Sequence, residues 1–210
     1  MIINWFGQSC FRIQGDKSVL VIDPLDKSCG LKVSRLAADI VALTQDQTEP
    51  NIKGVTEAEP FIVSNGGEYE VKDTFIYGIP VNPNGEGKKS ATKVIYRIEI
   101  DGVTLVHLGN ISQPLSTGEM EKLEGADILM IPVGGGNTLD AKQATEIISH
   151  LEPRIVIPMS YQLPGLKEKL DNIDKFCKEF GVCPTEQINK FKISKKDLPQ
   201  DDLQVVVLEP

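Results

Sequence analysis

The chain has 210 residues, of which 40% are hydrophobic and 25% charged, and its formal net charge is −8. This composition is typical of an ordinary globular protein, and the length is enough to bury a sizeable core in one domain, residues 1–210. The acidic balance argues against a nucleic-acid or anionic-membrane surface.

Targeting signals and cysteine spacing give the expected compartment. No stretch approaches the roughly 20 apolar residues of a membrane span. The N-terminus lacks the basic and apolar regions of a signal peptide. The four cysteines show neither CxxC nor finger spacing, so neither a zinc ribbon nor a disulfide framework is predicted. A reducing cytoplasm is therefore the expected location.

The first half of the chain is rich in short apolar and β-branched runs separated by turn residues, a pattern that predicts strands. The expected strands are residues 2–6, 10–13, 18–22, 39–43, 60–63, 75–81, 94–100 and 103–108. Asp101-Gly102 separates the last two runs and is a strong hairpin signal.

The second half alternates helices and strands. We expect helices at 117–123 and 138–151, the latter with Thr138 as N-cap, and strands at 127–133, 154–159 and 203–208. A further helix is predicted by apolar residues that recur every three or four positions and end before Gly181, with Cys177 in the core. These residues are Leu166, Leu170, Ile173, Cys177 and Phe180. The pattern favours an α/β (α+β) fold of two packed sheets with helices outside.

Several motifs spread over nearly the whole chain resemble those of the metallo-β-lactamase superfamily. The nearest resemblance is to the branch related to ascorbate-6-phosphate lactonase and to small bacterial Zn-dependent hydrolase-like proteins. The motifs are Trp5-Phe6-Gly7-Gln8-Ser9-Cys10-Phe11, Val21-Ile22-Asp23-Pro24, Gly66-Gly67-Glu68-Tyr69-Glu70-Val71, His107-Leu108-Gly109-Asn110, Ile131-Pro132-Val133-Gly134-Gly135 with Thr138-Leu139-Asp140-Ala141, and Ile157-Pro158-Met159-Ser160-Tyr161.

This resemblance implies an αββα sandwich of two mixed sheets with the site at one edge between them. It also implies one or two zinc or manganese ions, which activate water for attack on an ester, lactone or phosphodiester. In this chain, however, amides, a hydroxyl, a proline and one carboxylate stand where the resemblance places histidines and aspartates. These positions are Gln8, Gln45, Gln47, Glu49, Pro50, Asn82, Asn110 and Ser160.

Composition supports the loss of the metal. The whole chain has two histidines, His107 and His150, and neither falls on a ligand position. A carboxamide is a poor, neutral substitute for imidazole or carboxylate. We therefore expect no cofactor, although zinc or manganese is expected for the family, and we expect no catalytic residue of the family type.

Some residues have both a functional and a structural interpretation. His107 could act in catalysis with Cys10, but a hydrogen-bonded structural histidine and a buried, inert thiol in a strand are favoured. Ser160 lacks a nucleophile-elbow motif. Asp23, Asp46 and Glu49 could hold Mg²⁺ or Ca²⁺ weakly, or could be solvated loop carboxylates.

Two further features lie on or beside the predicted helix at 138–151. His150 lies near the C-terminus of that helix and could serve as a cap. Gly134-Gly135-Gly136 could cradle a phosphate, but a turn with positive φ is favoured.

The sequence therefore predicts a vestigial pocket whose polar side chains satisfy one another or bind a small polar ligand. Its residues are Gln8, Gln45, Asp46, Gln47, Glu49, Asn82, His107, Asn110 and Ser160. The expected function is that of a non-hydrolytic pseudoenzyme in binding or assembly, as a homo-oligomer or with an active paralogue. The alternative is a hydrolase of an ester, lactone or phosphodiester with a weak or non-standard metal site.

Overall fold

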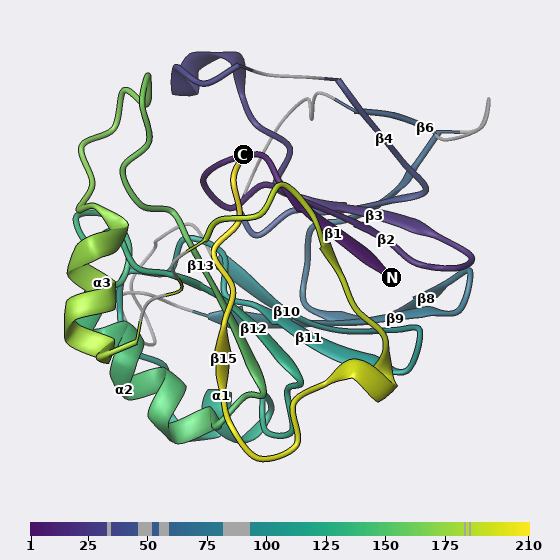
Figure 1. The fold of residues 1–210 in the computed structure, drawn as a ribbon. Helices are drawn as coiled ribbons and strands as arrows, with labels where there is room; N and C mark the ends of the chain where they lie inside the picture. Colours follow the sequence, from purple (N-terminus) through teal and green to yellow (C-terminus); the bar gives the residue numbers. More distant parts are fainter. Residues whose placement is uncertain (33–34, 46–51, 55–58, 82–92, 183, 185) are drawn as a thin grey trace.

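The computed structural model describes residues 1–32, 35–45, 52–54, 59–81, 93–182, 184 and 186–210. Two mixed β-sheets pack face to face (Figure 1). The first has the strand order β14-β1-β2-β3-β5-β7, with bounds Phe191–Lys192, Ile2–Trp5, Phe11–Gln14, Val19–Ile22, Ile40–Ala42 and Phe61–Val63. The second has the order β15-β13-β12-β11-β10-β9-β8, with bounds Gln204–Val205, Ile155–Met159, Ile128–Pro132, Val103–His107, Lys93–Ile100, Thr74–Val81 and Gly67–Val71.

The main core lies between the two sheets. Trp5, Phe11 and Tyr96 are among its largest fully buried side chains. The Tyr96 hydroxyl donates a hydrogen bond to the Leu43 carbonyl oxygen at 2.7 Å, which ties β10 of one sheet to the end of β5 in the other. Because a buried hydroxyl needs a partner, this bond fixes how the two sheets sit on each other.

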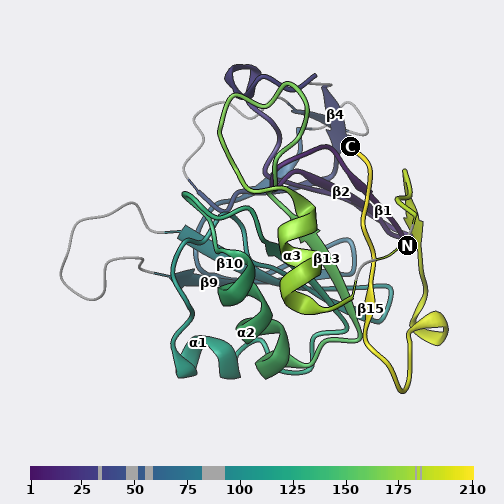
Figure 2. The ribbon, with the colours of Figure 1, turned by 60° about the vertical axis from the view of Figure 1, so that its left-hand side comes forward.

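The outer faces of the two sheets are covered differently. The helices α1 (Thr117–Glu121), α2 (Ala141–Leu151) and α3 (Ile173–Phe180) lie against the seven-stranded sheet (Figures 1 and 2). The outer face of the six-stranded sheet is covered in the described part by β4 (Leu36–Ala38) and β6 (Ile52–Gly54). A second apolar cluster lies beneath them, formed by Val21, Ala38, Val41, Leu43 and Ile52. None of the described helices has the length and apolar character that a membrane crossing demands.

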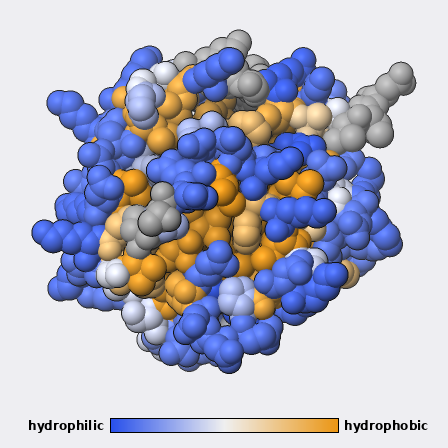
Figure 3. Space-filling model, viewed as in Figure 1, coloured by the Kyte–Doolittle hydropathy of each residue, from blue (hydrophilic) through white to orange (hydrophobic). Residues whose placement is uncertain are grey.

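The face seen in Figure 1 carries an apolar region bordered by polar residues (Figure 3). The chain after β15 runs across this face as residues 206–208, whose side chains are buried. Leu208 forms an isolated parallel bridge with Ile188, close to β14. The C-terminal segment thus connects the edge of one sheet to that of the other.

The hairpin expected at Asp101-Gly102 is confirmed. The strands β10 and β11 pair antiparallel from Ile100↔Val103 onward. Both turn residues are left-handed, with φ of 52° at Asp101 and 73° at Gly102. This is the geometry that a two-residue turn needs to match the strand twist, and glycine adopts it without steric cost.

The start of α2 differs from the prediction. The N-cap is Asp140, not Thr138, because the Asp140 carboxylate accepts a hydrogen bond from the Gln143 backbone N–H at 2.8 Å. The Gln143 side chain accepts in return from the Asp140 N–H at 3.0 Å. This reciprocal capping box outcompetes Thr138, whose hydroxyl donates to the Gly135 carbonyl within the preceding turn.

The helix predicted from Leu166 to Phe180 is also too long, although its end at Gly181 is confirmed with φ of 83°. Only Ile173–Phe180 is helical, and Phe176 is its buried residue. Cys177 is half-buried and disulfide-bonded, so the prediction that it is a core residue is wrong. Cys10 is buried as expected, but it precedes β2 and does not lie within a strand.

Candidate functional site

The candidate site lies where parallel strands of both sheets end. In the first sheet, β3 ends before Asp23 and β5 before Leu43-Thr44-Gln45. In the second, β11 leads to Asn110 and β13 to Ser160. The two sets of strand ends meet, because a Cβ added at Gly109 would lie 2.7 Å from the Thr44 side chain. The carboxyl ends of parallel strands are a common place for ligand sites in open α/β sheets.

A cavity of about 410 Å³ opens at this meeting point. Its described lining residues come from the β1–β2 turn, the segments after β3, β5 and β11, and the loop after β13. They are Gln8, Ser9, Asp23, Pro24, Leu25, Asp26, Cys29, Gln45, Asn110 and Glu168. The cavity is of the size that holds a small molecule.

Asn110 forms the centre of a neutral hydrogen-bond chain beside the cavity. The Ser160 hydroxyl donates to Asn110 Oδ1 at 2.6 Å. Asn110 Nδ2 in turn donates to the Ser9 hydroxyl oxygen at 3.1 Å. This chain joins the ends of β11 and β13 to the turn between β1 and β2. The amide and the two hydroxyls therefore crosslink three segments without any ionised side chain.

Asp23 is held on the cavity wall by Thr44. Its two carboxylate oxygens accept from the Thr44 backbone N–H at 2.7 Å and from the Thr44 hydroxyl at 2.6 Å. Both bonds are charge-assisted, so they fix the carboxylate in one orientation. Asp23 is thus a positioned negative charge that joins β3 to β5.

His107 is a fully buried structural residue behind the cavity. Its Nδ1 accepts from the Gly109 N–H at 3.1 Å, so the proton lies on Nε2, which donates to the Ser9 carbonyl at 3.0 Å. Burial lowers its pKa below the usual 6.5. The histidine is therefore neutral and occupied by two backbone groups, which agrees with the structural interpretation of this residue.

This burial predicts that acid destabilises the protein through His107. A neutral buried histidine takes up its proton less readily than one in the unfolded chain, so stability is full above pH 6.5 and falls as the pH drops below it. The slope is up to about 1.4 kcal/mol per pH unit for one proton. Denaturant unfolding at several pH values should show a stability difference between the wild type and His107→Gln that shrinks as the pH falls.

His150 is the matched control for that experiment. It is exposed in the last turn of α2. His150→Gln is measured in parallel, because it makes the same substitution at an exposed position. A pH dependence of His107→Gln equal to that of the wild type would contradict the prediction.

Other candidate nucleophiles are inactive in this arrangement. Burial raises the pKa of Cys10 to about 12, so it stays a neutral thiol. The Ser160 hydroxyl donates to an amide oxygen, which cannot take its proton as a base. Gly135 and Gly136 adopt φ of 65° and 63°, as the positive-φ interpretation of the glycine turn predicted.

The backbone around the cavity is strained at three non-glycine residues. Gln8, Asp23 and Ser160 have φ of 50°, 44° and 52°. Such conformations cost about 1–3 kcal/mol each and cluster at functional sites. All three lie at the strand ends and turn that form the site, so the surrounding packing holds this backbone geometry in place.

The side chains in the described part do not fit a zinc or manganese ion. There, no three histidine, cysteine, aspartate or glutamate residues are grouped so that they could hold a metal. Both oxygens of Asp23 already accept hydrogen bonds from Thr44. Neutral amides and a hydroxyl do not supply the charge that repays dehydration of such an ion.

The structure brings together part of the predicted pocket. Gln8, Gln45 and Asn110 line the cavity, while His107 and Ser160 lie behind it in the hydrogen-bond network. Four predicted residues lie outside the described part of the chain: Asp46, Gln47, Glu49 and Asn82.

The sequence did not predict Ser9, Leu25, Asp26, Cys29 and Glu168 on the wall. Ser9 adjoins Gln8 in the opening motif, which could have suggested it. Glu168 had no such signal, because the loop that carries it was predicted to be helical.

Comparison with known proteins identifies the family. Residues 2–160 match the model of the β-lactamase superfamily domain. A protein of Thermococcus onnurineus named metal-dependent hydrolase is 27% identical over 188 residues, which cover 76% of this chain and 84% of that protein. One of Pyrococcus furiosus with the same name is 29% identical over 193 residues, with the same coverage of both chains.

Solved structures show the same fold. A protein of Thermotoga maritima, assigned to the Zn-dependent hydrolases of the metallo-β-lactamase superfamily, gives a TM-score of 0.79 at 24% identity and covers 99% of both chains. A metallo hydrolase of Ignicoccus hospitalis gives 0.59 at 20% identity and covers 92% of this chain and 99% of that one. Because the family match includes every strand end that forms the cavity, the chain belongs to the β-lactamase superfamily and has the metallo-β-lactamase fold.

Proposed function

We propose that this protein is a metal-independent member of the superfamily whose cavity binds a small polar ligand without hydrolysing it. The Ser9–Asn110–Ser160 chain carries this proposal. Asn110 and Ser160 stand where the family resemblance places the bridging aspartate and the last histidine. Their side chains are engaged with each other, at 2.6 Å, and take the structural role that a bound cation would have in crosslinking these strand ends.

The chemistry of hydrolysis gives a second support. Metal-dependent hydrolases make their nucleophile by lowering the pKa of a bound water towards about 7. The described wall offers neutral amides, a serine hydroxyl, a thiol and carboxylates, and the neighbouring His107 is occupied at both ring nitrogens. Nothing among these groups generates hydroxide at neutral pH.

Metal content tests the proposal directly. The protein, purified without a histidine tag, should carry far less than one equivalent of zinc or manganese by elemental analysis, and its melting temperature should not change with EDTA. The Thermococcus onnurineus relative, purified in the same way, is the matched control. One equivalent of either metal per chain would overturn the proposal.

A second candidate function is hydrolysis with a weak or non-standard metal site. The names of the relatives favour it, because several are called metal-dependent hydrolases. The carboxylates Asp23, Asp46 and Glu49 are the residues that would serve such a site, and Asp23 does line the cavity.

A screen of phosphodiesters, lactones and thioesters with and without Mn²⁺ separates the two candidates. Mn²⁺-dependent turnover that disappears in Glu49→Ala and persists in Glu146→Ala, an exposed glutamate of α2, would favour the hydrolase. Absence of turnover under all these conditions favours the metal-independent binding protein.

A further inference from the structure

We infer that the cavity selects small ligands that carry a positive charge, such as amines and amino sugars, and rejects anions. This inference deepens the proposed function and rests on it. The inference concerns the cavity at the strand ends and the charge of the ligand that binds there. A bound cation would offset the charge of the wall, so a site without one presents the charge of its own side chains.

The described wall is negative. Three of its residues are carboxylates, Asp23, Asp26 and Glu168, and none of the described lining residues is lysine, arginine or histidine. Asp23 is held in one orientation by Thr44. Asp23 is half-buried, so its charge is screened less than the charges of Asp26 and Glu168, which are exposed.

Glu168 lies at the rim of the cavity and comes from a different part of the chain. Its two carboxylate oxygens accept from Gln8 Nε2 at 3.4 Å and Asn137 Nδ2 at 3.3 Å. Both partners are neutral amides, so they position the carboxylate without cancelling its charge. The negative groups therefore approach the cavity from separate segments, with neutral donors between them.

Lys93 lies near the cavity but does not reverse the negative charge of its wall. Lys93 donates from its ammonium group to the Asn110 backbone oxygen, behind the wall. It lines a separate cavity of about 30 Å³ together with Ile111, Ser112 and Leu115. Its charge offsets part of the charges of Asp23 and Glu168, but its side chain is not among those that line the larger cavity.

The neutral groups of the wall suit hydroxyl-bearing ligands. Gln45 is exposed, so its amide is accessible to a ligand, and Ser9 adds a hydroxyl. An amide both donates and accepts, which matches the hydroxyls of a sugar or amino alcohol. With a volume of about 410 Å³, the cavity has room for a ligand of hexose size.

Ligands of similar size but different charge test the inference on the full chain. Glucosamine, glucose and glucose 6-phosphate differ mainly in charge, and ethanolamine, ethylene glycol and phosphoglycolate form a second series. Titrations followed by NMR or calorimetry should show at least one amine that binds about tenfold tighter than its neutral counterpart, with no detectable binding of the phosphate. The amine's affinity should fall with added salt.

Variants localise the binding. Glu168→Gln should weaken the amine about three- to fivefold, as expected for loss of one partly screened charge, and leave the melting temperature unchanged. Glu146→Gln on α2 is the matched control and should leave affinity unchanged. Binding of a phosphate, or binding of no amine in either series, would overturn the inference.

This result is separable from that of the metal test. A metal-free protein that binds phosphates would refute only the charge preference. A protein with stoichiometric zinc would already have failed the earlier experiment.

Discussion

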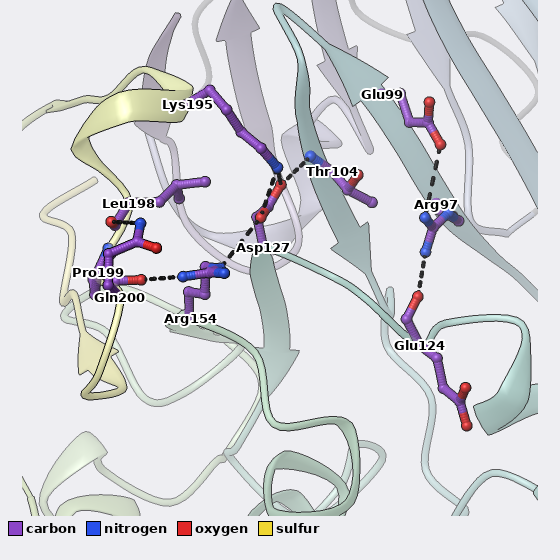
Figure 4. A network of polar contacts seen from close by, with 10 residues as sticks. All are labelled: Arg97, Glu99, Thr104, Glu124, Asp127, Arg154, Lys195, Leu198, Pro199 and Gln200. Atoms are coloured by element: carbon purple, nitrogen blue, oxygen red, sulfur yellow. Dashed lines mark hydrogen bonds and ion pairs between the residues drawn. The ribbon is translucent and has the colours of Figure 1, made fainter.

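Replacement of Asp127 by alanine is expected to lower the free energy of unfolding by about 1–3 kcal/mol, the cost of leaving a hydrogen-bond donor without its acceptor. Asp127 lies directly before β12, and its side chain is only 7% exposed. Figure 4 shows its carboxylate facing Lys195, Arg154 and the backbone of Thr104. It is the one group on which these three contacts converge.

The contacts of Asp127 join three parts of the chain. Its carboxylate accepts from the Thr104 N–H of β11 at 2.8 Å and from the Lys195 ammonium at 2.7 Å. Arg154 precedes β13, and its Nε lies 3.7 Å from Asp127 Oδ1. The Arg154 guanidinium also donates a hydrogen bond to the Pro199 carbonyl oxygen. Alanine would leave the half-buried Thr104 N–H without its acceptor, and this lost hydrogen bond is the main cost. The side chains of Lys195 and Arg154 are exposed, so the loss of their counter-ion adds less.

Two variants distinguish this effect from a general loss of charge. Asp127→Asn keeps an acceptor for the Thr104 N–H and should cost less than alanine. Glu146→Ala removes an exposed pair with Lys142, whose charged atoms are 4.0 Å apart, and should cost about 0.3–0.5 kcal/mol. Denaturant unfolding measures all three. A cost below 1 kcal/mol for Asp127→Ala would show that the network does not stabilise the fold.

The sequence predicted the strands that position the cavity because their burial is regular. Runs such as Ile128–Pro132 and Ile155–Met159 are buried at every position, so they are apolar throughout and bounded by polar residues. Ser160 follows such a run directly, and Gln45 and Asn110 lie in the short segments after β5 and β11, so their place near the strand ends could be predicted. The Asp101-Gly102 turn was predictable for a similar local reason.

The loop between β13 and α3 could not be predicted in this way. The spacing of Leu166 and Leu170 matched a helix, but the backbone there bonds to distant segments. The Lys167 N–H donates to the Cys29 carbonyl at 3.1 Å, and the Gln162 N–H to the Asp171 carbonyl at 2.9 Å. These tertiary contacts override local periodicity. They also bring Glu168 to Gln8, 160 positions away in the sequence, which no local pattern reveals.

Replacement of Gly134 by alanine is expected to cost about 3 kcal/mol or more, through overpacking against backbone. Gly134 follows β12, and an added Cβ would lie 2.1 Å from the Ser160 carbonyl oxygen and 3.0 Å from the Leu170 side chain. The two strands cannot separate to make room, because the Val133 N–H donates to the Met159 carbonyl at 3.0 Å. A shift would also break the Asp171 N–H bond to the Gly134 carbonyl, 2.7 Å long.

The damage should reach the cavity as well as the global stability. Ser160 is already strained at φ of 52°, and its hydroxyl is the first donor in the chain to Asn110 and Ser9. Displacing it should release the Asn110 side-chain amide, and NMR of that amide would report faster exchange with solvent.

Gly118→Ala is the matched control, because a Cβ in α1 meets nothing within 4 Å. Alanine there should be neutral or stabilising by up to about 1 kcal/mol, since it favours a helix over glycine. A neutral surface substitution changes the free energy of unfolding by up to about 0.5 kcal/mol. If Gly134→Ala changes it by no more than this, the ends of β12 and β13 are not held as closely as their hydrogen bonds indicate.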